Sequence, residues 1–321
     1  MTLALVFPGQ GSQHVGMGMP LAEAFPEARQ VFEEVDDALG RALSRIVFEG
    51  PGDDLTATEN AQPALLAVSM AVLRVLTNQG GLDVGGRAAF VAGHSLGEYA
   101  ALAAAGALTL ADAARLLDAR GAAMKRAGAQ AKQDTGADGS MSALLGADIK
   151  MAEEVVDFAA KKTGQICVVA NDNGPGQVVI SGHEPALDVA EELAKEAGAK
   201  RAVRLGVSAA FHSPLMAPAA EVMHDVLGSA DLRSPLTPVV ANVTAAPVSD
   251  AEEIRELLEQ QITSRVRWRE TVDAMGAAGV DTLVEVGAGK VLTGINRRIN
   301  RDLVTVSVET PEDVEAFLKS L

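Results

Sequence analysis

The sequence predicts an α/β fold with a mainly parallel sheet, interrupted by a small inserted α+β domain. Short apolar runs that suit buried strands alternate with longer helical patterns, and this alternation is typical of parallel sheets. In the middle of the chain the order changes to the β-α-β-β-α-β succession of ferredoxin-like domains. At 321 residues, with 48% hydrophobic and 22% charged residues, the chain is expected to form one large domain, or a large one and a small one.

Five apolar runs are expected to be buried strands of the main sheet. They are Leu3–Phe7, Ala88–Ala92, Thr237–Ala241, Thr282–Val286 and Val304–Val308. The helical patterns between them are Ala61–Asn78, Ser95–Ala105, Leu110–Gly128, Ser213–Leu227, Ala251–Ile262 and Trp268–Ala278. Because only 3% of the residues are aromatic, the core must be built from Ala, Leu, Val and Met, and we expect close helix contacts through alanine.

The inserted domain follows a polar, glycine-rich segment, Ala127–Ser140, which is expected to be a loop or linker. Its expected elements are, in order, strand Met141–Leu145, helix Lys150–Lys161, strand Ile166–Ala170, strand Gln177–Ser181, helix Pro185–Glu196 and strand Arg201–Leu205. We therefore place a small ferredoxin-like domain at residues 129–205 and a large α/β domain at residues 1–128 and 206–321.

Charge and cysteine content restrict the class of protein. A formal net charge of −16 argues against sequence-independent nucleic-acid binding, which depends on Lys and Arg against phosphate. The single cysteine, Cys167, excludes an internal disulfide, fits a reducing compartment and is expected to be a core thiol. No signal peptide is expected, because the apolar run Leu3–Phe7 is too short for one. No membrane span is expected, because every long apolar stretch is interrupted by other residues. We expect a soluble, cytoplasmic protein.

The joint between the second predicted strand and the next helix reads Gly93-His94-Ser95-Leu96-Gly97. Ser95 and Glu98 alone would suggest a capping box, in which the serine only caps the helix. The flanking glycines instead match the G-x-S-x-G nucleophile elbow, whose tight turn exposes the hydroxyl above the sheet. There the amide of Leu96 and the helix dipole would stabilise an oxyanion. Since strand, turn and helix follow in this order, we interpret Ser95 as a nucleophile.

A serine nucleophile needs a base, and the chain has five histidines. His212 is the preferred candidate because it precedes Ser213-Pro214, a pair suited to a helix start whose dipole would keep the imidazole neutral. His94 adjoins the serine, but adjacent side chains diverge at an elbow, so it is expected to brace the turn. The remaining histidines are His14 after the first loop, His183 in the inserted domain and His224 within a helix.

Arg120 shares one helix face with Leu116 and Met124, and no acidic residue occupies a neighbouring turn of that face. An arginine in such an apolar stripe needs a partner for its charge. A substrate carboxylate or an internal salt bridge to a distant Asp or Glu would both serve, and the spacing favours neither.

Two glycine-rich segments lack the spacing of phosphate loops: FPGQGSQ (Phe7–Gln13) and EVGAGK (Glu285–Lys290). The first is expected to approach the elbow closely, so that its amides complete an oxyanion hole beside Leu96. Motifs such as C-x-x-C and H-E-x-x-H do not occur, and we expect no metal and no cofactor.

Six ordered segments together resemble the malonyl-CoA:acyl carrier protein transacylases of bacterial type II fatty acid synthesis, over nearly the full chain. They are FPGQGSQ, GHSLGEYAAL, RGAAM (Arg120–Met124), NDNGPGQVVISG (Asn171–Gly182), AAFHSPLM and EVGAGKVLTG. The resemblance implies a hydrolase-like α/β domain with a ferredoxin-like insertion. It also implies transfer of the malonyl group from malonyl-CoA to the phosphopantetheine thiol of acyl carrier protein, through a malonyl-serine intermediate in a ping-pong scheme that supplies fatty acid synthesis.

The resemblance also implies roles for individual residues. These are nucleophile for Ser95, base for His212, oxyanion-hole amides for Gln10 and Leu96, malonyl-carboxylate binding for Arg120 and, through its main-chain carbonyl, orientation of the histidine for Gln261. The family uses a Ser–His dyad, so no third catalytic carboxylate is expected. Ala210–His212 (AFH) resembles malonyl-selective relatives, whereas AAFH departs from the HAFH that is frequent in polyketide relatives.

The implied partners are malonyl-CoA and acyl carrier protein, with no nucleic acid, no membrane and a monomeric chain. The carrier protein is expected to be acidic, like this chain, so a local basic patch near the cleft is expected. The candidates are Lys200, Arg201 and Arg204, followed by Arg297 and Arg298. Ordinary solvated surface charges are the alternative interpretation.

Two other functions fit part of the sequence. A serine hydrolase or thioesterase shares the elbow and the dyad, but α/β-hydrolases place their histidine late in the chain, and no histidine follows His224. A non-catalytic docking subunit would use Ser95 as a helix cap only.

Overall fold

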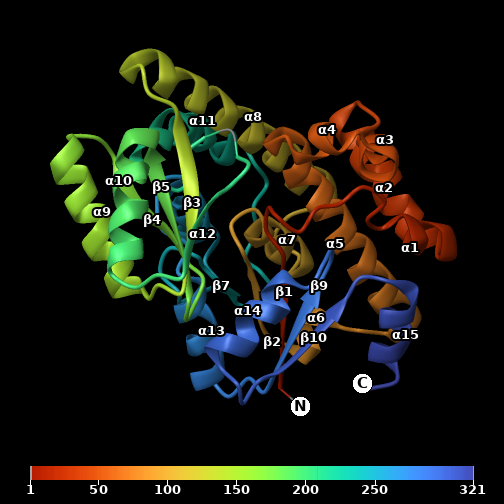
Figure 1. The fold of residues 1–321 in the computed structure, drawn as a ribbon. Coiled ribbons are helices and arrows are strands. Elements are labelled where there is room, and N and C mark those ends of the chain that lie inside the picture. The colour runs from red at the N-terminus through yellow and green to blue at the C-terminus, as the bar shows by residue number, and fades with distance from the viewer. Residues whose placement is uncertain (1, 208, 321) are drawn as a thin grey trace.

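The computed structural model describes residues 2–207 and 209–320, and its larger sheet is mainly parallel (Figure 1). The strand order is β10-β9-β1-β2-β7-β8, and only the pairing of β7 with β8 is antiparallel. The strands are β1 (Leu3–Phe7), β2 (Ala88–Gly93), β7 (Val239–Val240), β8 (Pro247–Val248), β9 (Thr282–Val286) and β10 (Val304–Val308). The five expected strands are therefore present, although β7 is shorter than expected and β8 was not expected.

Helices cover both faces of this sheet, as the alternation along β1 shows. Leu3, Leu5 and Phe7 pack into the larger core with α5, α7 and α8, whereas Ala4 and Val6 face a second core with α13 and α14. The helices of the large part are α1 (Met19–Ala24), α2 (Pro26–Leu39), α3 (Leu43–Glu49), α4 (Gly52–Thr56), α5 (Thr58–Gly80), α6 (Val84–Arg87), α7 (Gly97–Ala104), α8 (Leu110–Thr135), α11 (Ala217–Gly228), α12 (Ala251–Gln261), α13 (Trp268–Ala277), α14 (Val291–Ile299) and α15 (Pro311–Leu318).

Helix α5 corrects the expectation that no stretch is apolar enough to cross a membrane. The helix has 23 residues, and an 18-residue window within it has a mean hydropathy of 1.2, which meets that criterion by length and composition. However, 78% of the apolar window is buried inside the protein, where α5 packs against α2 and α8. The helix is apolar because it lies at the centre of the core.

The polar segment Ala127–Ser140 is not a loop, as had been expected from its composition. Helix α8 continues to Thr135 and ends at Gly136, whose φ of 70° is the left-handed conformation typical of a helix end. Ala127, Gly128 and Ala131 lie on its buried face, so helical periodicity extends through the polar stretch.

The second sheet is antiparallel, with the order β4-β5-β3-β6. Its elements are β3 (Gly139–Leu145), α9 (Ile149–Thr163), β4 (Cys167–Asp172), β5 (Gln177–His183), α10 (Glu184–Glu196) and β6 (Arg201–Arg204). This is the expected ferredoxin-like succession, and the fold class is confirmed. The division at residues 129 and 205 stays a prediction. Cys167 is buried here, and burial raises the pKa of its thiol to about 12, as suits a core residue.

The two faces of the small sheet have different neighbours. Leu144, Val178 and Ile180 pack with α9 and α10 into a separate core on the outer side, on the left in Figure 1. Met141, Ala143 and Val179 point to the opposite side, where they join the core of the large part. The small sheet therefore presents an apolar wall to the large part.

Candidate active site

The serine turn has the geometry of a nucleophile elbow. Ser95 has a φ of 53°, a strained value for a residue with a side chain, at the carboxyl end of β2. The glycines on either side are required by space: a Cβ on Gly93 would lie 1.9 Å from the backbone of Gly97, and one on Gly97 would lie 2.4 Å from the carbonyl oxygen of Phe7. Among the described residues no side chain caps α7, so the capping-box interpretation of Ser95 is wrong.

His212 lies across the cleft from this elbow, within hydrogen-bond distance of the serine. Its Nε2 atom is 2.8 Å from Ser95 Oγ, and its Nδ1 atom is 2.8 Å from the carbonyl oxygen of Gln261 and 3.1 Å from that of Ser264. Because carbonyl oxygens only accept, Nδ1 carries the proton and Nε2 is free to accept one from the serine. This is the arrangement that a general base requires.

The pKa of His212 is lowered to about 3, first by burial and then by the positive charge of Arg120. The sequence-based reason for a neutral imidazole was the dipole of the following helix, but burial in the cleft is the larger cause. Ser213 does start that segment as expected: its hydroxyl accepts a hydrogen bond from Leu215 N, at the start of the 3₁₀ turn Pro214–Met216.

Arg120 points into the same cleft and is almost completely buried. It donates from Nη1 to Gln62 Oε1 (2.7 Å) and from Nη2 to Gln261 Oε1 (2.8 Å) and Ser95 Oγ (3.1 Å). In the described part of the chain no carboxylate lies within 4.0 Å of its guanidinium, and its Nε–H has no acceptor. Of the two partners left open by the sequence, a direct internal salt bridge is therefore not formed.

Gln10 and Leu96 line the same cavity as Ser95. Neither main-chain amide has an acceptor within the ranges that the structure describes, so both can donate to an incoming oxyanion. Gly9 lets the N-terminal loop reach the elbow, because a Cβ there would lie 2.7 Å from the carbonyl oxygen of His94. The loop thus approaches the elbow as expected.

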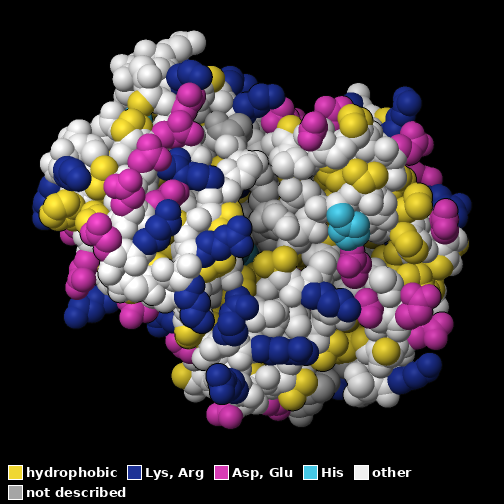
Figure 2. Space-filling model, in the orientation of Figure 1, with side chains coloured by type: hydrophobic (Ala, Val, Ile, Leu, Met, Phe, Trp, Pro, Cys, Tyr) yellow, Lys and Arg dark blue, Asp and Glu magenta, His cyan; other side chains and the backbone are white. Residues whose placement is uncertain are grey.

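The cavity around these groups measures about 490 Å³, a volume suited to a small acyl group with part of its carrier. Ser95, Arg120 and His212, which belong to the large part, line one side of the cavity. Met141, Ala143 and Val179 of the small sheet form one wall, and Val291, Leu292 and Ile295 of α14 form another. Figure 2 shows the mouth as the central hollow of the molecule, with Lys and Arg side chains gathered on its lower left rim.

Asparagines that the sequence analysis did not single out hold the elbow. Asn242 accepts from Ser95 N through Oδ1 (2.7 Å) and donates to Gly93 O through Nδ2 (2.7 Å). Asn173 Oδ1 lies 2.8 Å from His94 Nε2, so His94 does brace the turn. Asn242 could have been predicted from its position just after a parallel strand, because functional side chains gather at the carboxyl ends of such strands.

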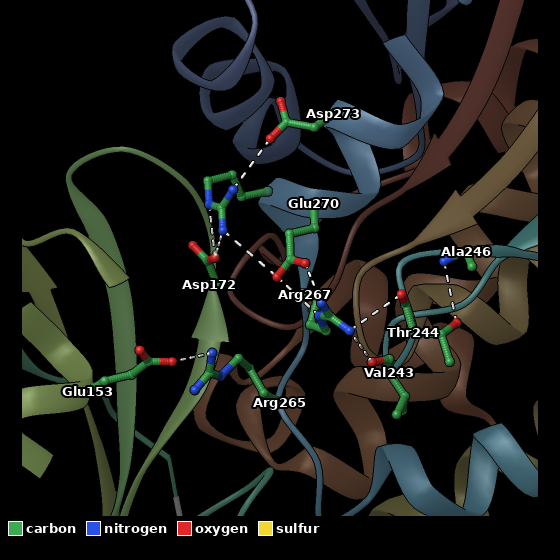
Figure 3. Close-up of polar contacts among 10 residues, drawn as sticks. Glu153, Asp172, Val243, Thr244, Ala246, Arg265, Arg267, Glu270 and Asp273 are labelled. Carbon is green, nitrogen blue, oxygen red and sulfur yellow. Dashed lines mark hydrogen bonds and ion pairs between the residues drawn. The ribbon is translucent and has the colours of Figure 1, made fainter. Parts of the chain in front are cut away.

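The segment between α12 and α13, residues 262–267, joins the two sheets beside the site (Figure 3). Val266 N donates to Ala170 O (2.8 Å) and Val266 O accepts from Asp172 N (2.9 Å), which adds a short parallel partner to β4. Ion pairs flank this contact: Arg265 with Glu153 (2.9 Å) and Arg269 with the buried Asp172 (2.8 Å). Since Ser264 also supports His212, this segment connects the small sheet to the base.

The elbow, the histidine and the buried arginine around one cavity define an acyl-transferring serine enzyme. Comparison with known proteins agrees: the family model described as acyl transferase domain matches residues 4–310, so the chain belongs to that family and is an acyltransferase. A malonyl CoA-acyl carrier protein transacylase of Bacillus subtilis is 44% identical over 319 residues, covering 99% of this chain and 97% of the relative. The corresponding Escherichia coli protein is 42% identical over 316 residues, covering 98% of both.

Solved structures agree over the full chain. The acyl-carrier-protein-S-malonyltransferase from Bartonella henselae is 54% identical, with a TM-score of 0.94 and coverage of 100% of this chain and 99% of that one. A malonyl-transacylase solved in complex with a holo type II PKS acyl-carrier protein is 40% identical, with a TM-score of 0.93 over all of both chains. These similarities confirm the family that the six sequence segments resemble.

Proposed function

We propose that this protein transfers the malonyl group from malonyl-CoA to the phosphopantetheine thiol of acyl carrier protein, in the cytoplasm, as a supply step of fatty acid synthesis. The names of its relatives support the substrate and the acceptor. One geometric observation carries the assignment of residues: Ser95 Oγ lies 2.8 Å from His212 Nε2 and 3.1 Å from Arg120 Nη2 in one cavity. A nucleophile, a neutral base and a cation for a carboxylate are thus within reach of one small acyl group.

In the first half of the reaction His212 removes the proton from Ser95 Oγ as that oxygen attacks the thioester carbonyl. The amides of Gln10 and Leu96 donate to the oxyanion of the tetrahedral intermediate. As the carbon–sulfur bond breaks, His212 gives its proton to the departing coenzyme A thiolate. The malonyl carboxylate meanwhile accepts from the Arg120 guanidinium, which holds the acyl group in the cavity.

In the second half the phosphopantetheine thiol of the carrier protein enters by the route that coenzyme A left. His212 takes its proton, the sulfur attacks the malonyl-serine ester, and Ser95 regains its proton from the imidazolium. The same base and the same oxyanion donors serve both halves, which is what a ping-pong scheme needs.

The test is mass spectrometry of the protein after mixing with malonyl-CoA alone. We expect one malonyl adduct on the peptide that contains Ser95, and none on Ser95→Ala. Addition of holo acyl carrier protein should discharge the adduct to the carrier, with little free malonate. Release of malonate in place of carrier loading would identify a thioesterase, and a wild-type protein that takes no label would favour a docking subunit.

A further inference from the structure

The side chain of Gln261 lies between two buried charged groups that do not touch each other. Its Oε1 accepts from Arg120 Nη2 at 2.8 Å, and its Nε2 donates to Glu98 Oε2 at 2.8 Å and to the carbonyl oxygen of Ser95 at 3.0 Å. Gln261 and Arg120 are 0% and 1% exposed and Glu98 is 2% exposed, so no bulk water competes for these contacts. Arg120 and Glu98 are thus connected by a relay through one amide.

The neighbours of this amide fix its direction. A guanidinium can only donate, whereas the Ser95 carbonyl can only accept and the Glu98 carboxylate oxygen accepts here. Rotating the amide by half a turn would set N–H groups against the Arg120 N–H groups and oxygen against two acceptors. Both the ionised and the protonated carboxyl offer an acceptor oxygen, so the direction holds although burial raises the pKa of Glu98 to about 7.

The same oxygen of Glu98 holds a second segment of the site. Asn242 N donates to Glu98 Oε2 at 3.1 Å, and the side chain of Asn242 accepts from Ser95 N. Gln261, for its part, holds His212 through its main-chain carbonyl. Glu98 Oε2 therefore connects the segment that positions the nucleophile with the segment that positions the base.

We propose that Glu98 is a positioning residue of the transfer reaction: through the side-chain amide of Gln261 it presents an acceptor to Arg120, so that the guanidinium faces the position of the malonyl carboxylate. This inference rests on the proposed role of Arg120. Without the relay, Arg120 keeps its hydrogen bonds to Gln62 and Ser95 and its place over the Tyr99 ring, but its Nη2 group loses the acceptor that fixes its direction. Selectivity for a carboxylate-bearing acyl group then falls. Any loss of Ser–His geometry through Asn242 or Gln261 lowers the malonyl and acetyl rates alike and leaves their ratio unchanged.

The test compares serine acylation from malonyl-CoA and from acetyl-CoA, as kcat/KM for each. In Glu98→Ala the malonyl-to-acetyl ratio should fall about tenfold or more, the loss typical of one charge-assisted hydrogen bond. Glu98→Gln retains an acceptor oxygen and should keep the ratio to within about threefold. Glu98→Met fills a similar volume without that acceptor and should lose the ratio as Glu98→Ala does, which loss of packing alone does not predict. Gln261→Met, which keeps the main-chain carbonyl, should lose as much as Glu98→Ala, and the double variant should lose no more because the two groups act in series.

Two further variants, Arg120→Ala and Glu285→Gln, distinguish a failure of the proposed Arg120 role from a failure of the proposed Glu98 role. Arg120→Ala tests the proposed role of Arg120 independently; if it lowers both rates equally, that role fails whatever Glu98 does. Glu285, which accepts from Leu292 N and Thr293 N, is the matched control: Glu285→Gln should lower Tm without changing the ratio. An unchanged ratio in folded Glu98→Ala overturns the inference. Should that variant not fold, an unchanged ratio in Gln261→Met overturns it equally.

Discussion

His212 Nδ1 lies 2.8 Å from the main-chain carbonyl oxygen of Gln261, at the place where a Ser-His-Asp triad has a carboxylate. A carbonyl fixes the ring and its tautomer but contributes no negative charge to stabilise an imidazolium. Burial and the nearby Arg120 act in the opposite direction and lower the pKa of His212 to about 3. The resting base is therefore neutral over the whole physiological range.

This neutral base predicts an unusual pH profile. With acetyl-CoA as donor, so that the carboxylate contact plays no part, kcat/KM for acylation of Ser95 should stay level as the pH falls from about 8 to about 5. An unperturbed histidine would instead lose activity around its ordinary pKa of about 6.5. Stopped-flow acylation across this range is the measurement, and a single inflection near pH 6.5 would contradict the burial argument.

Arg120 is predicted to discriminate between acyl groups. Arg120→Ala should lower kcat/KM for malonyl-CoA about 10- to 100-fold more than for acetyl-CoA, because a charge-assisted hydrogen bond to the malonyl carboxylate is lost. Arg120→Lys keeps the charge but replaces the planar guanidinium with one ammonium nitrogen, which cannot bind a carboxylate bidentately, so its loss should be intermediate. Parallel acylation rates with the two donors provide the check, and a uniform loss would exclude a carboxylate contact.

Asn242 is predicted to maintain the strained conformation of Ser95. In Asn242→Ala the Ser95 amide and the Gly93 carbonyl lose their partners, which should cost about 1–3 kcal/mol of unfolding free energy. Acylation should slow as well, because the elbow no longer holds the hydroxyl toward His212. Urea unfolding and the acylation rate are the two measurements. Asn242→Asp should lose at least as much as Asn242→Ala, because a buried carboxylate oxygen would then face the Gly93 carbonyl oxygen. An unchanged acylation rate in folded Asn242→Ala would contradict the role of Asn242.

The ion pair of Arg269 with the buried Asp172 is predicted to hold the small sheet against the large part. Asp172→Asn should destabilise the protein by about 1–3 kcal/mol, since Arg269 is about one-third exposed and water compensates part of the loss. Coupling between Asp172→Asn and Arg269→Gln in a double-mutant cycle is the measurement. Additive effects would mean that the pair does not act as a unit.

Strand and glycine patterns were enough to predict the strands other than β8 and the glycine-flanked turn at Ser95, because these depend on local periodicity and on short motifs. Helices α1, α3 and α4 were not predicted, since they are short and lie among glycines and prolines that also suit loops. The 14-residue α2 was missed although Ala28, Val31, Phe32 and Val35 form an apolar helix face, and α6, α14 and α15 were not predicted either. The polar end of α8 was assigned to a loop for the same compositional reason. Glu98 looked like a helix cap because S-x-x-E is a local pattern, whereas its actual partners, Gln261 and Asn242, lie more than 140 residues away. Contacts of this kind are set by the tertiary fold and leave no local signal.

The expected basic patch is narrower than its five candidates. Arg204 does not offer a free charge, because its guanidinium pairs with Asp188 (2.6 Å) and with Glu191. Arg297 donates to Thr305 and Arg298 to Gln177, a residue of the cavity wall. Lys200 is exposed and belongs to none of the ion pairs among the described residues, and the same holds for Arg201. The partner of Arg201 in β3 is Leu145, which also pairs with Gln177, so Arg201 and Arg298 approach the same end of the small sheet.

Charge reversal at Arg201 is therefore predicted to weaken encounter with an acidic carrier protein. Arg201→Glu should raise KM for holo acyl carrier protein about threefold to tenfold at low ionic strength, with acylation by malonyl-CoA unchanged, and the difference should shrink as salt screens the charges. Lys162→Glu, at the exposed end of α9 on the outer side of the small sheet, makes the same change of charge away from the cavity and should leave KM unaltered. Equal effects of the two variants would indicate a response to net charge alone, and no effect of Arg201→Glu would remove this residue from the docking surface.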